Sequence, residues 1–415
     1  MSITIDSARL WDSLMAMAAI GATPAGGCNR QALTDEDGQG RRQLALWGAE
    51  LGLQLSVDRL GNMMLTRAGT DASLPVVAMG SHLDTQPTGG RFDGVLGVLA
   101  GLEVMRALHG AGIATRAPLA LVNWTNEEGA RFAPPMMGSG AAMGLFTEAE
   151  ILGRTAIDGA RFGDELARIG WQGSADPSAM QRLGAYFELH IEQGPVLERE
   201  NLTIGVVTGS AAQQWYDIEV TGAEAHAGAP MQGRRDTLMA AAAMMNAAEA
   251  IVLERNAASG GGEARCSVGR ILPSPGSRNV VPGKTWFSLD LREEDAPPLA
   301  ALCGAVAARL AAIAAERDVD LRITPFWDFP RTPFDTALVG HVREAATARG
   351  FAHRDMATAI GHDAVYVARK LPTAMIFVPC HGGISHNEAE SITQEWAAAG
   401  CQVLADAALA AAGRA

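Results

Sequence analysis

Two short, nearly all-apolar runs constrain the fold of this chain more than any other feature. Residues 75–80 read PVVAMG and residues 119–124 read LALVNW, and runs of this kind are typical of strands buried on both faces of a sheet. A long apolar segment, residues 92–109, lies between them and is expected to be helical. Because parallel strands need a crossover connection, this order predicts an α/β fold with a mixed, mostly parallel sheet covered by helices.

The flanking parts of the chain extend this alternation of helices and strands. Residues 1–21 predict an amphipathic helix, and Thr34 followed by three acids predicts the start of a second helix. Residues 57–66 are expected to form one strand, and the alanine-rich residues 394–412 are expected to form the final helix.

The middle of the chain follows a different pattern. Strands are expected at residues 215–220, 266–272, 285–292 and 319–325, and helices at residues 237–253 and 299–316, with a glycine-rich loop at residues 259–262. The order strand, helix, strand, strand, helix, strand is that of a ferredoxin-like α+β unit. Such a unit is expected as an inserted domain at residues 213–329, within a main domain split between residues 1–212 and 330–415.

Charge and composition exclude several classes of protein. The 415 residues carry 33 Lys+Arg and 46 Asp+Glu, a net charge of −13, with no basic run that could neutralise a phosphate backbone, so nucleic acid is not an expected partner. No uncharged apolar run reaches about eighteen residues, so no membrane span is expected. The five cysteines are scattered, and Asp6 and Asp12 argue against a signal peptide, so a reduced, cytoplasmic protein is expected.

The first group of candidate site residues follows the strand at residues 75–80. His82 and Asp84 come after it, where open α/β sheets have their active sites, and Asp93 opens the next helix. A His-x-Asp pair supplies a metal ligand and a carboxylate that fixes its tautomer. Each residue alone also fits a plainer role, as a loop histidine or an acidic helix cap.

Two adjacent carboxylates follow the second buried strand. Glu127 and Glu128 are expected on a turn, where neighbouring charges repel each other unless they share a cation or a proton. In a metal site, one glutamate binds the ion while the other takes a proton from water. An exposed glutamate pair without any site would explain the same two residues.

His190 and His386 are two further candidates, each beside an apolar strand and a glycine turn. Singly, each also fits a structural histidine. Together with His82, Asp93 and Glu128, they give three ligands to each of two metals if Asp93 bridges. That count leaves coordination positions for water and substrate, as a hydrolytic site requires.

Ordered motifs along almost the whole chain resemble the amidase branch of the M20 metallopeptidase superfamily. This branch comprises N-carbamoyl-L-amino-acid hydrolases, β-ureidopropionases and allantoate amidohydrolases. The resemblance is carried by the segments GSHLDTQPTGGRFDGVLGVLAGLEV, NWTNEEGARF, ELHIEQGPVLE, AHAG, RRDTL, RNVVPG, LDLR, GHDA and FVPCHGGISHNEAE. The ELHIEQGPVLE segment is more similar to the amidase branch than to the dipeptidase or acylase branches.

The resemblance implies a dinuclear centre of zinc or manganese, which open nitrogen and oxygen ligand shells do not distinguish. It implies that one ion is bound by His82, Asp93 and His190, and the other by Asp93, Glu128 and His386. It also implies that Glu127 is the general base and that Asp84 orients His82.

In the family that this chain resembles, the inserted domain is a lid that also forms the dimer, so a homodimer is expected. His226 resembles the histidine that the partner subunit offers to the developing oxyanion. Asn279 and Arg292 match positions that hold the substrate carboxylate. The remaining matches imply that Gln193 and Gln214 lie near the polar end of the substrate, and that Gly361 and Gly383 let backbone groups approach it.

The activity implied is metal-dependent hydrolysis of the ureido C–N bond of a small substrate, an N-carbamoyl-L-amino acid or N-carbamoyl-β-alanine, to the amino acid, ammonia and carbon dioxide. Residues 229–231 and 358–361 depart from the family's motifs, which leaves substrate identity open. Trp215 stands where allantoate enzymes often carry arginine and favours a carbamoyl amino acid, with allantoate hydrolysis as the alternative.

Three further functions are compatible with the same residues. The chain could be a dipeptidase or N-acyl amino acid hydrolase of the same superfamily. It could also be a non-catalytic binding protein, although a full set of five ligand residues and Glu127 argues against this. The third is a cysteine amidase that uses Cys380 beside His381, which would need a lowered thiol pKa and a base within reach.

Overall fold

The computed structural model describes residues 3–258, 264–293 and 295–413. These residues form two units, the first combining the chain up to Gly209 with the chain from Pro333, and the second formed by Ser210–Thr332. The expected limits of the inserted domain, residues 213 and 329, each lie three residues inside the second unit. The glycine-rich loop expected at residues 259–262 falls outside the described residues.

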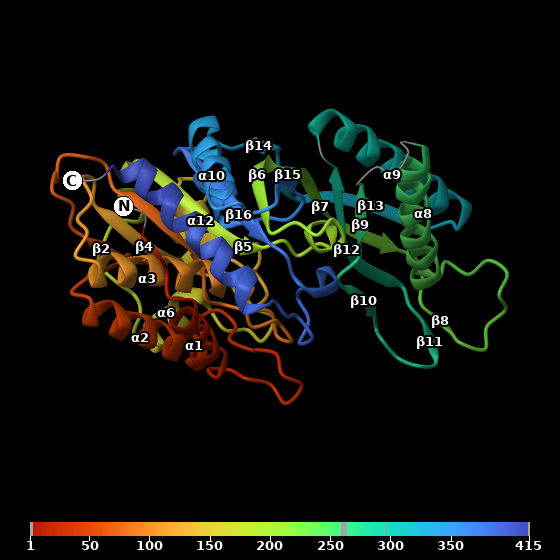
Figure 1. The fold of residues 1–415 in the computed structure, drawn as a ribbon. Coiled ribbons are helices and arrows are strands. Elements are labelled where there is room, and N and C mark those ends of the chain that lie inside the picture. Colours follow the sequence, from red (N-terminus) through yellow and green to blue (C-terminus); the bar gives the residue numbers. More distant parts are fainter. Residues whose placement is uncertain (1–2, 259–263, 294, 414–415) are drawn as a thin grey trace. The chain divides into compact units, whose positions relative to one another are not determined.

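A nine-stranded sheet forms the centre of the first unit (Figure 1). Its strands run in the order β1 (Gln54–Val57), β2 (Met63–Arg67), β4 (Leu119–Trp124), β3 (Val77–His82), β5 (Ala185–Ile191), β16 (Thr373–Val378), β6 (Ile204–Ser210) and β14 (Thr332–Pro333), and β15 (His353–Thr358) pairs with β6. The central strands β4, β3, β5 and β16 are parallel and fully buried, whereas β1, β2 and β6 pair with antiparallel neighbours. The predicted mixed, mostly parallel sheet is confirmed.

Helices from both ends of the chain cover this sheet. The helices α1 (Ser7–Ala18), α3 (Val95–Gly110) and α12 (Gln394–Ala412) pack against one another, and α10 (Thr336–Ala348) packs on α12 and β16. Both α3 and α12 also contact β3 and β5, so the last helix completes a core begun in the first third of the chain (Figure 1). The remaining helices of this unit are α2 (Asp35–Glu50), α4 (Met137–Ala142), α5 (Glu148–Leu152), α6 (Phe162–Arg168), α7 (Val196–Arg199), α11 (Asp363–Val367) and the short 3₁₀ helices η1 (Pro177–Arg182) and η2 (His381–Gly383).

The predicted bounds of β4 and α12 are confirmed, but the prediction of a single strand at residues 57–66 is wrong. The chain turns at residues 58–62 and forms the antiparallel hairpin β1–β2. Asp58 stabilises the turn, because its Oδ1 accepts hydrogen bonds from the backbone N–H groups of Leu60 and Asn62 at 2.9 and 3.0 Å. Aspartate is a common turn residue for this reason.

The second unit has the ferredoxin-like order of elements. In chain order these are β7 (Ala212–Thr221), α8 (Thr237–Ala258), β9 (Arg265–Ser267), β10 (Ile271–Ser274), β12 (Lys284–Glu293), α9 (Ala296–Glu316) and β13 (Asp320–Phe329), with a small ladder between β8 (Ala225–His226) and β11 (Val280–Val281). The sheet is antiparallel in the order β10-β12-β7-β13, and β9 also pairs with β12. The single strand predicted at residues 266–272 is therefore two strands.

By length and composition alone, α8 and α9 could each cross a membrane. Both contribute buried side chains to the core of the second unit, among them Ala240 and Met244 from α8 and Leu302 and Leu310 from α9. A helix that lays one apolar face on a sheet in this way is typical of the core of a folded domain.

The strand order of the first unit brings three strand ends to one edge of its sheet. Because β4, β3 and β5 are parallel neighbours, their carboxyl ends lie together. The close approach of β3 to β4 depends on Gly80, since a Cβ at this position would lie 2.1 Å from the carbonyl oxygen of Val122. The residues that follow these strands are thereby held side by side.

Replacing Gly80 with alanine should lower the free energy of unfolding by about 1–3 kcal/mol, because the added methyl group meets the backbone of β4. Gly340→Ala is the matched control, since Gly340 lies inside α10 and a Cβ there meets nothing within 4 Å. Alanine in that helix should stabilise it by up to about 1 kcal/mol. Urea unfolding followed by circular dichroism compares the variants, and wild-type stability of Gly80→Ala would contradict the prediction.

Candidate metal centre

Five potential metal ligands come from five segments of the first unit. His82 ends β3, Asp93 precedes α3, Glu128 follows β4, His190 lies at the end of β5, and His386 follows η2. Four of these side chains are buried, whereas that of His386 is 49% exposed. The structure brings all five predicted ligand residues together at the carboxyl edge of the parallel strands.

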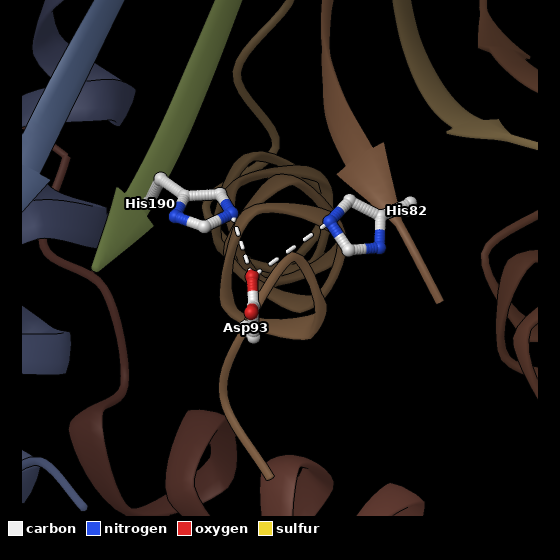
Figure 2. Close-up of side chains that lie close together, drawn as sticks. All are labelled: His82, Asp93 and His190. Atoms are coloured by element: carbon white, nitrogen blue, oxygen red, sulfur yellow. Dashed lines mark ion pairs between the residues drawn. The ribbon is translucent and has the colours of Figure 1, made fainter. Parts of the chain in front are cut away.

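His82, Asp93 and His190 form a first ligand set (Figure 2). The Nε2 atom of His190 lies 3.1 Å from Asp93 Oδ1, and the Nε2 atom of His82 lies 3.9 Å from the same oxygen. Figure 2 shows the two imidazole rings reaching in from the ends of β5 and β3, with the carboxylate between them. The ligand atoms all lie within 4.8 Å of one another, so one ion could contact all three residues.

Hydrogen bonds to main-chain carbonyl groups fix which nitrogen of each imidazole ring faces the ligand set. Nδ1 of His82 donates to the carbonyl oxygen of Asp84, and Nδ1 of His190 donates to that of Ile191, each at 2.9 Å. A carbonyl oxygen only accepts, so in the neutral ring each Nε2 keeps a lone pair. Nε2 of His190 also accepts the backbone N–H of Gly94 at 3.1 Å, whereas Nε2 of His82 lies 3.5 Å from Glu127 Oε2 and 3.9 Å from Asp93 Oδ1. A lone pair that faces a carboxylate oxygen is repelled unless a proton or a metal ion lies between them.

Asp93, Glu128 and His386 form a second ligand set. The Nε2 atom of His386 lies 3.3 Å from Asp93 Oδ2 and 3.2 Å from Glu128 Oε2. Asp93 therefore offers Oδ1 to the first set and Oδ2 to the second. A carboxylate with one oxygen toward each ligand set is suited to bridging two ions.

The carboxylates of the two ligand sets favour positive charge on His190 and His386, whereas burial lowers the pKa of His82. Burial lowers the pKa of His386, but the carboxylates of Glu128 and Asp93 outweigh it and raise this pKa to about 11. Burial also opposes protonation of His190, yet Asp93 raises the pKa of this residue to about 9. Surroundings that draw protons onto two imidazoles would also stabilise bound divalent cations.

The donor atoms fit divalent metal ions. Imidazole nitrogens and carboxylate oxygens are the ligands that zinc and manganese accept in proteins. Over the described residues, His82 Nε2 is buried and has no hydrogen-bond partner. Buried polar atoms are normally satisfied, so this nitrogen is suited to binding a metal ion.

Backbone strain is concentrated around the two ligand sets. Asn126, Gln193 and His386 have φ values of 58°, 55° and 52°, in the left-handed region that non-glycine residues rarely adopt. Gly94 has a φ of 67°, and a Cβ there would lie 2.3 Å from the ring of His82. The loops after β4 and β5 are therefore held in conformations that local preference alone does not favour.

Glu127 and Asp84 complete this edge of the sheet. Glu127 Oε2 lies 3.5 Å from His82 Nε2, and burial together with the charges of Asp363 and Glu128 raises the pKa of Glu127. The ring of His82 is held by the main-chain oxygen of Asp84, and the Asp84 carboxylate, expected to orient it, lies 3.9 Å away. This carboxylate accepts the backbone N–H groups of Glu127 and Glu128, each at 3.2 Å, so it positions both glutamates.

Gln193 contacts the shared carboxylate directly. Its Nε2 donates to Asp93 Oδ2 at 2.8 Å and to the hydroxyl of Ser385 at 2.9 Å. A carboxylate only accepts, so the orientation of the amide is fixed and Oε1 is left as an acceptor. In the part of the chain that the structure describes, this oxygen is buried and has no hydrogen-bond partner.

Sequence reasoning missed four buried polar residues beside the centre, Glu188, His362, Asp363 and Glu390. His362 packs on His190 with ring centroids 4.4 Å apart. The signals that could have found them are the GHDA and ELHIEQGPVLE motifs and the last glutamate of FVPCHGGISHNEAE, because these segments contain all four residues.

Glu188, His190 and His362 also lie close enough to share an ion. The carboxylate of Glu188, however, already accepts hydrogen bonds from the hydroxyls of Ser81 and Tyr186 and from the backbone N–H of Ala364, at 2.6, 3.3 and 2.8 Å. This group is therefore satisfied as a buried polar network without a metal ion.

The two predicted glycines lie in the first unit, Gly361 in a loop and Gly383 at the end of η2. Gly361 directly precedes His362, between β15 and α11. Gly383 has a φ of 69°, and a Cβ there would lie 2.6 Å from backbone atoms of Gly194 and Pro195. In this structure Gly383 therefore permits a close approach between η2 and the turn that follows β5.

The predicted residues of the second unit have partners within that unit. His226 is exposed on β8, and its Nδ1 accepts a hydrogen bond from the N–H of Gly228 at 3.1 Å. The hydrogen of the neutral ring is therefore on Nε2. Asn279 lies beside His226, since the main-chain carbonyl oxygen of Asn279 accepts the N–H of Ala227 at 2.8 Å.

Arg292 and Gln214 lie on the neighbouring strands β12 and β7. The guanidinium of Arg292 pairs with Asp290, with Nη2 at 2.6 Å and Nε at 3.0 Å from Oδ2. The amide of Gln214 donates to Asp328 at 3.0 Å and accepts from the hydroxyl of Tyr216 at 2.6 Å. Both side chains are thus oriented by neighbours of their own sheet.

The geometry disfavours a cysteine nucleophile at Cys380. This thiol is fully buried and lies 3.9 Å from the carbonyl oxygen of Gly194. Burial raises its pKa to about 12, whereas a reactive cysteine needs a lowered pKa. The adjacent His381 is bonded through Nδ1 to Glu198 at 3.0 Å.

Two nitrogen and oxygen ligand sets that share one carboxylate at the carboxyl edge of a parallel sheet are the arrangement of a metal-dependent hydrolase. The model of peptidase family M20/M25/M40 matches residues 78–410, and the chain belongs to this family. The resemblance to the M20 superfamily is therefore confirmed.

Individual relatives lie in the amidase branch. An N-carbamoyl-L-amino-acid amidohydrolase from Rhizobium meliloti is 47% identical over 406 residues, 98% of this chain and 96% of the relative. The allantoate amidohydrolase of Escherichia coli (strain K12) is 33% identical over 399 residues, 95% of each chain. The crystal structure of a hydantoinase/carbamoylase family amidase from Burkholderia vietnamiensis matches with a TM-score of 0.94 at 47% identity, covering 99% of this chain and 98% of that one.

Gly94→Ala should weaken binding of a divalent ion about 10- to 100-fold, because the added Cβ meets the ring of His82 and displaces its Nε2. Gly112→Ala is the control, since Gly112 also has a positive φ, 62°, but a Cβ there meets nothing within 4 Å. Isothermal titration of the metal-free proteins with Mn²⁺ separates the steric effect from backbone strain. Equal affinities of the two variants would contradict the assignment of His82.

Proposed function

We propose that this protein hydrolyses the ureido C–N bond of small N-carbamoyl amino acids, releasing the amino acid, ammonia and carbon dioxide. The observation that carries the proposal is the Asp93 carboxylate shared by two ligand sets, with the Glu127 carboxylate 3.5 Å from His82 Nε2. The similarity to the N-carbamoyl-L-amino-acid amidohydrolase of Rhizobium meliloti supports the substrate class.

The proposed cofactors are two divalent ions, zinc or manganese. One would be held by His82, Asp93 and His190, and the other by Asp93, Glu128 and His386. When bound, such ions polarise a carbonyl group and lower the pKa of water.

Glu127 is the proposed general base. Its carboxylate takes a proton from water as the water oxygen bonds to the carbamoyl carbon, and it returns the proton to the leaving nitrogen as the C–N bond breaks. Burial beside Asp363 and Glu128 raises its pKa and so strengthens it as a base, and cations in the two ligand sets offset part of this rise. His226 of the partner subunit is proposed to donate Nε2–H to the oxyanion, a role that its tautomer supports.

The side chain of Gln193 supports a substrate with a carbamoyl group over one with an acetyl group. Its Nε2 is held by Asp93 and Ser385, and its Oε1 is a buried acceptor without a partner among the described residues. An unpaired buried acceptor costs about 1–3 kcal/mol, and an N–H of a carbamoyl substrate would satisfy it whereas a methyl group would not.

The remaining substrate contacts are proposed from the family's motifs. Arg292 and Asn279 would hold the substrate carboxylate, for which the planar guanidinium is suited. Gln214, Gly361 and Gly383 would lie near the substrate's polar groups.

A homodimer and a cytoplasmic location complete the proposal. The homodimer rests on the resemblance to the family, in which the inserted domain forms the dimer, and α8 of this domain exposes Met239 and Leu253. All five cysteines are free, as is usual in a reducing compartment.

Allantoate is the second candidate substrate, because the allantoate amidohydrolase of Escherichia coli is similar along 95% of this chain. Trp215 favours the carbamoyl amino acid, since it lies against Phe326 and Trp327 with ring centroids 6.4 and 4.8 Å away. This aromatic cluster presents an apolar surface in place of the arginine often found there in allantoate enzymes.

Ammonia release by the manganese-loaded and zinc-loaded protein tests the proposed function. The substrates are N-carbamoyl-β-alanine, several N-carbamoyl-L-amino acids and allantoate, and an N-acetyl amino acid is followed by free amine. Release from carbamoyl amino acids is expected, with none after chelation. Activity on allantoate alone would make allantoate the substrate in place of the carbamoyl amino acids. Cleavage of the acetyl compound alone would overturn the proposal.

Exchanging each of the adjacent glutamates for glutamine should separate proton transfer from metal binding. Glu127→Gln should lower kcat by at least about 10²-fold while Mn²⁺ binding stays close to wild type. Glu128→Gln should weaken Mn²⁺ binding, because Glu128 lies 3.2 Å from His386 in the second ligand set. Steady-state kinetics and calorimetry measure the two effects, and full activity of Glu127→Gln would exclude it as the base.

A further inference from the structure

Glu390 lies against the backbone that carries the shared carboxylate. It is 1% exposed, in the loop before α12. Its Oε1 accepts the backbone N–H groups of Phe92 and Asp93, at 2.9 and 3.1 Å. Both hydrogen bonds come from the residues that set the direction of the Asp93 side chain.

The second oxygen of Glu390 connects to the side chain of Asp93. The hydroxyl of Ser385 lies 2.8 Å from Glu390 Oε2 and 3.2 Å from Asp93 Oδ2. Gln193 Nε2 donates one hydrogen to this hydroxyl and the other to Asp93 Oδ2. A hydroxyl has one hydrogen, and the shorter contact assigns the hydrogen of Ser385 to Glu390. The hydrogen bonds therefore run from Gln193 to Ser385 and from Ser385 to Glu390.

The backbone before Asp93 leaves room for the Glu390 carboxylate. A Cβ at Gly90 would lie 1.9 Å from the carboxyl carbon of Glu390 and 2.0 and 2.3 Å from its oxygens. The loop at residues 90–93 can therefore close around this carboxylate only because residue 90 has no side chain.

We propose that Glu390 is a positioning residue that fixes the Asp93 carboxylate between the two ligand sets, through the Asp93 backbone on one side and Ser385 on the other. The proposal rests on the metal centre of the proposed function. Asp93 must keep Oδ1 near His190, at 3.1 Å, and Oδ2 near His386, at 3.3 Å. A small rotation of its side chain removes one of these contacts, so an outer carboxylate that prevents rotation supports both sets.

Titration of metal-free protein with Co²⁺ tests this role, by calorimetry and by visible absorption, which reports the ligand geometry. Glu390→Ala should bind Co²⁺ about 10- to 100-fold more weakly than wild type and shift the absorption bands. Glu390→Gln should fall between them, because an amide oxygen still accepts the two backbone N–H groups. Ser385→Ala should change the spectrum in the same direction, and Gly90→Ala should reproduce the effect by displacing Glu390.

Glu103→Gln is the matched control. Glu103 is a fully buried carboxylate in α3 that accepts the backbone N–H of Asp6 at 2.8 Å and pairs with Arg9, and its loss should leave the Co²⁺ spectrum unchanged. Thermal unfolding without metal verifies that each variant is folded. Wild-type Co²⁺ affinity and spectrum in both Glu390→Gln and Ser385→Ala would overturn the proposal. Since the titration uses no substrate, failure of the wild-type protein on the carbamoyl substrates would count against the proposed function alone.

Discussion

The placement of one carboxylate between three imidazole rings is the constraint on which the rest of the centre depends. Asp93 faces His190 and His82 with one oxygen and His386 with the other, and main-chain carbonyls force the rings of His82 and His190 to present Nε2. Such an arrangement is stable only when positive charge fills the space between the donors. The buried acids Glu127, Glu128 and Asp84 add negative charge to the same region. The fold therefore holds together a group of side chains that would repel one another in isolation.

The parallel sheet supplies the rigidity that this arrangement requires. The carboxyl end of β3 is paired with β4 as far as His82, and that of β5 is paired with β16 as far as Ile191. Glycine at residues 80, 90 and 94 removes side chains where backbone, carboxylate and ring approach closely. Three left-handed residues at loop positions add strain that the buried surroundings must offset. The same few positions therefore contribute both to the stability of the sheet and to the geometry of the metal centre.

Much of this could be predicted from the sequence, because apolar runs such as residues 119–124 specify buried strands and the motifs specify a family. The five ligand residues were predicted for that reason. The hairpin at residues 57–66 was missed because the side chain of Asp58, and not apolar periodicity, decides where the chain turns. The FVPCHGGISHNEAE motif contains Glu390, but the hydrogen-bond partners of Glu390 and of Asp84 could not be predicted, since both carboxylates accept backbone N–H groups from distant segments. A motif identifies a residue type at a position, but hydrogen-bond partners far along the chain are set by tertiary packing.

The first unit is formed by two separate stretches of sequence, so the ligand residues of the centre are synthesised at different times. All residues of the first ligand set lie before the second unit, whereas His386 and Glu390 lie after it. A ribosome-bound chain that has emerged only through residue 332 therefore possesses one three-residue ligand set and lacks β16 and α12, which contact β5 in the finished protein, and α10, which packs on both of them. The second set, and with it the bridging role of Asp93, exists only once nearly the entire polypeptide has left the ribosome.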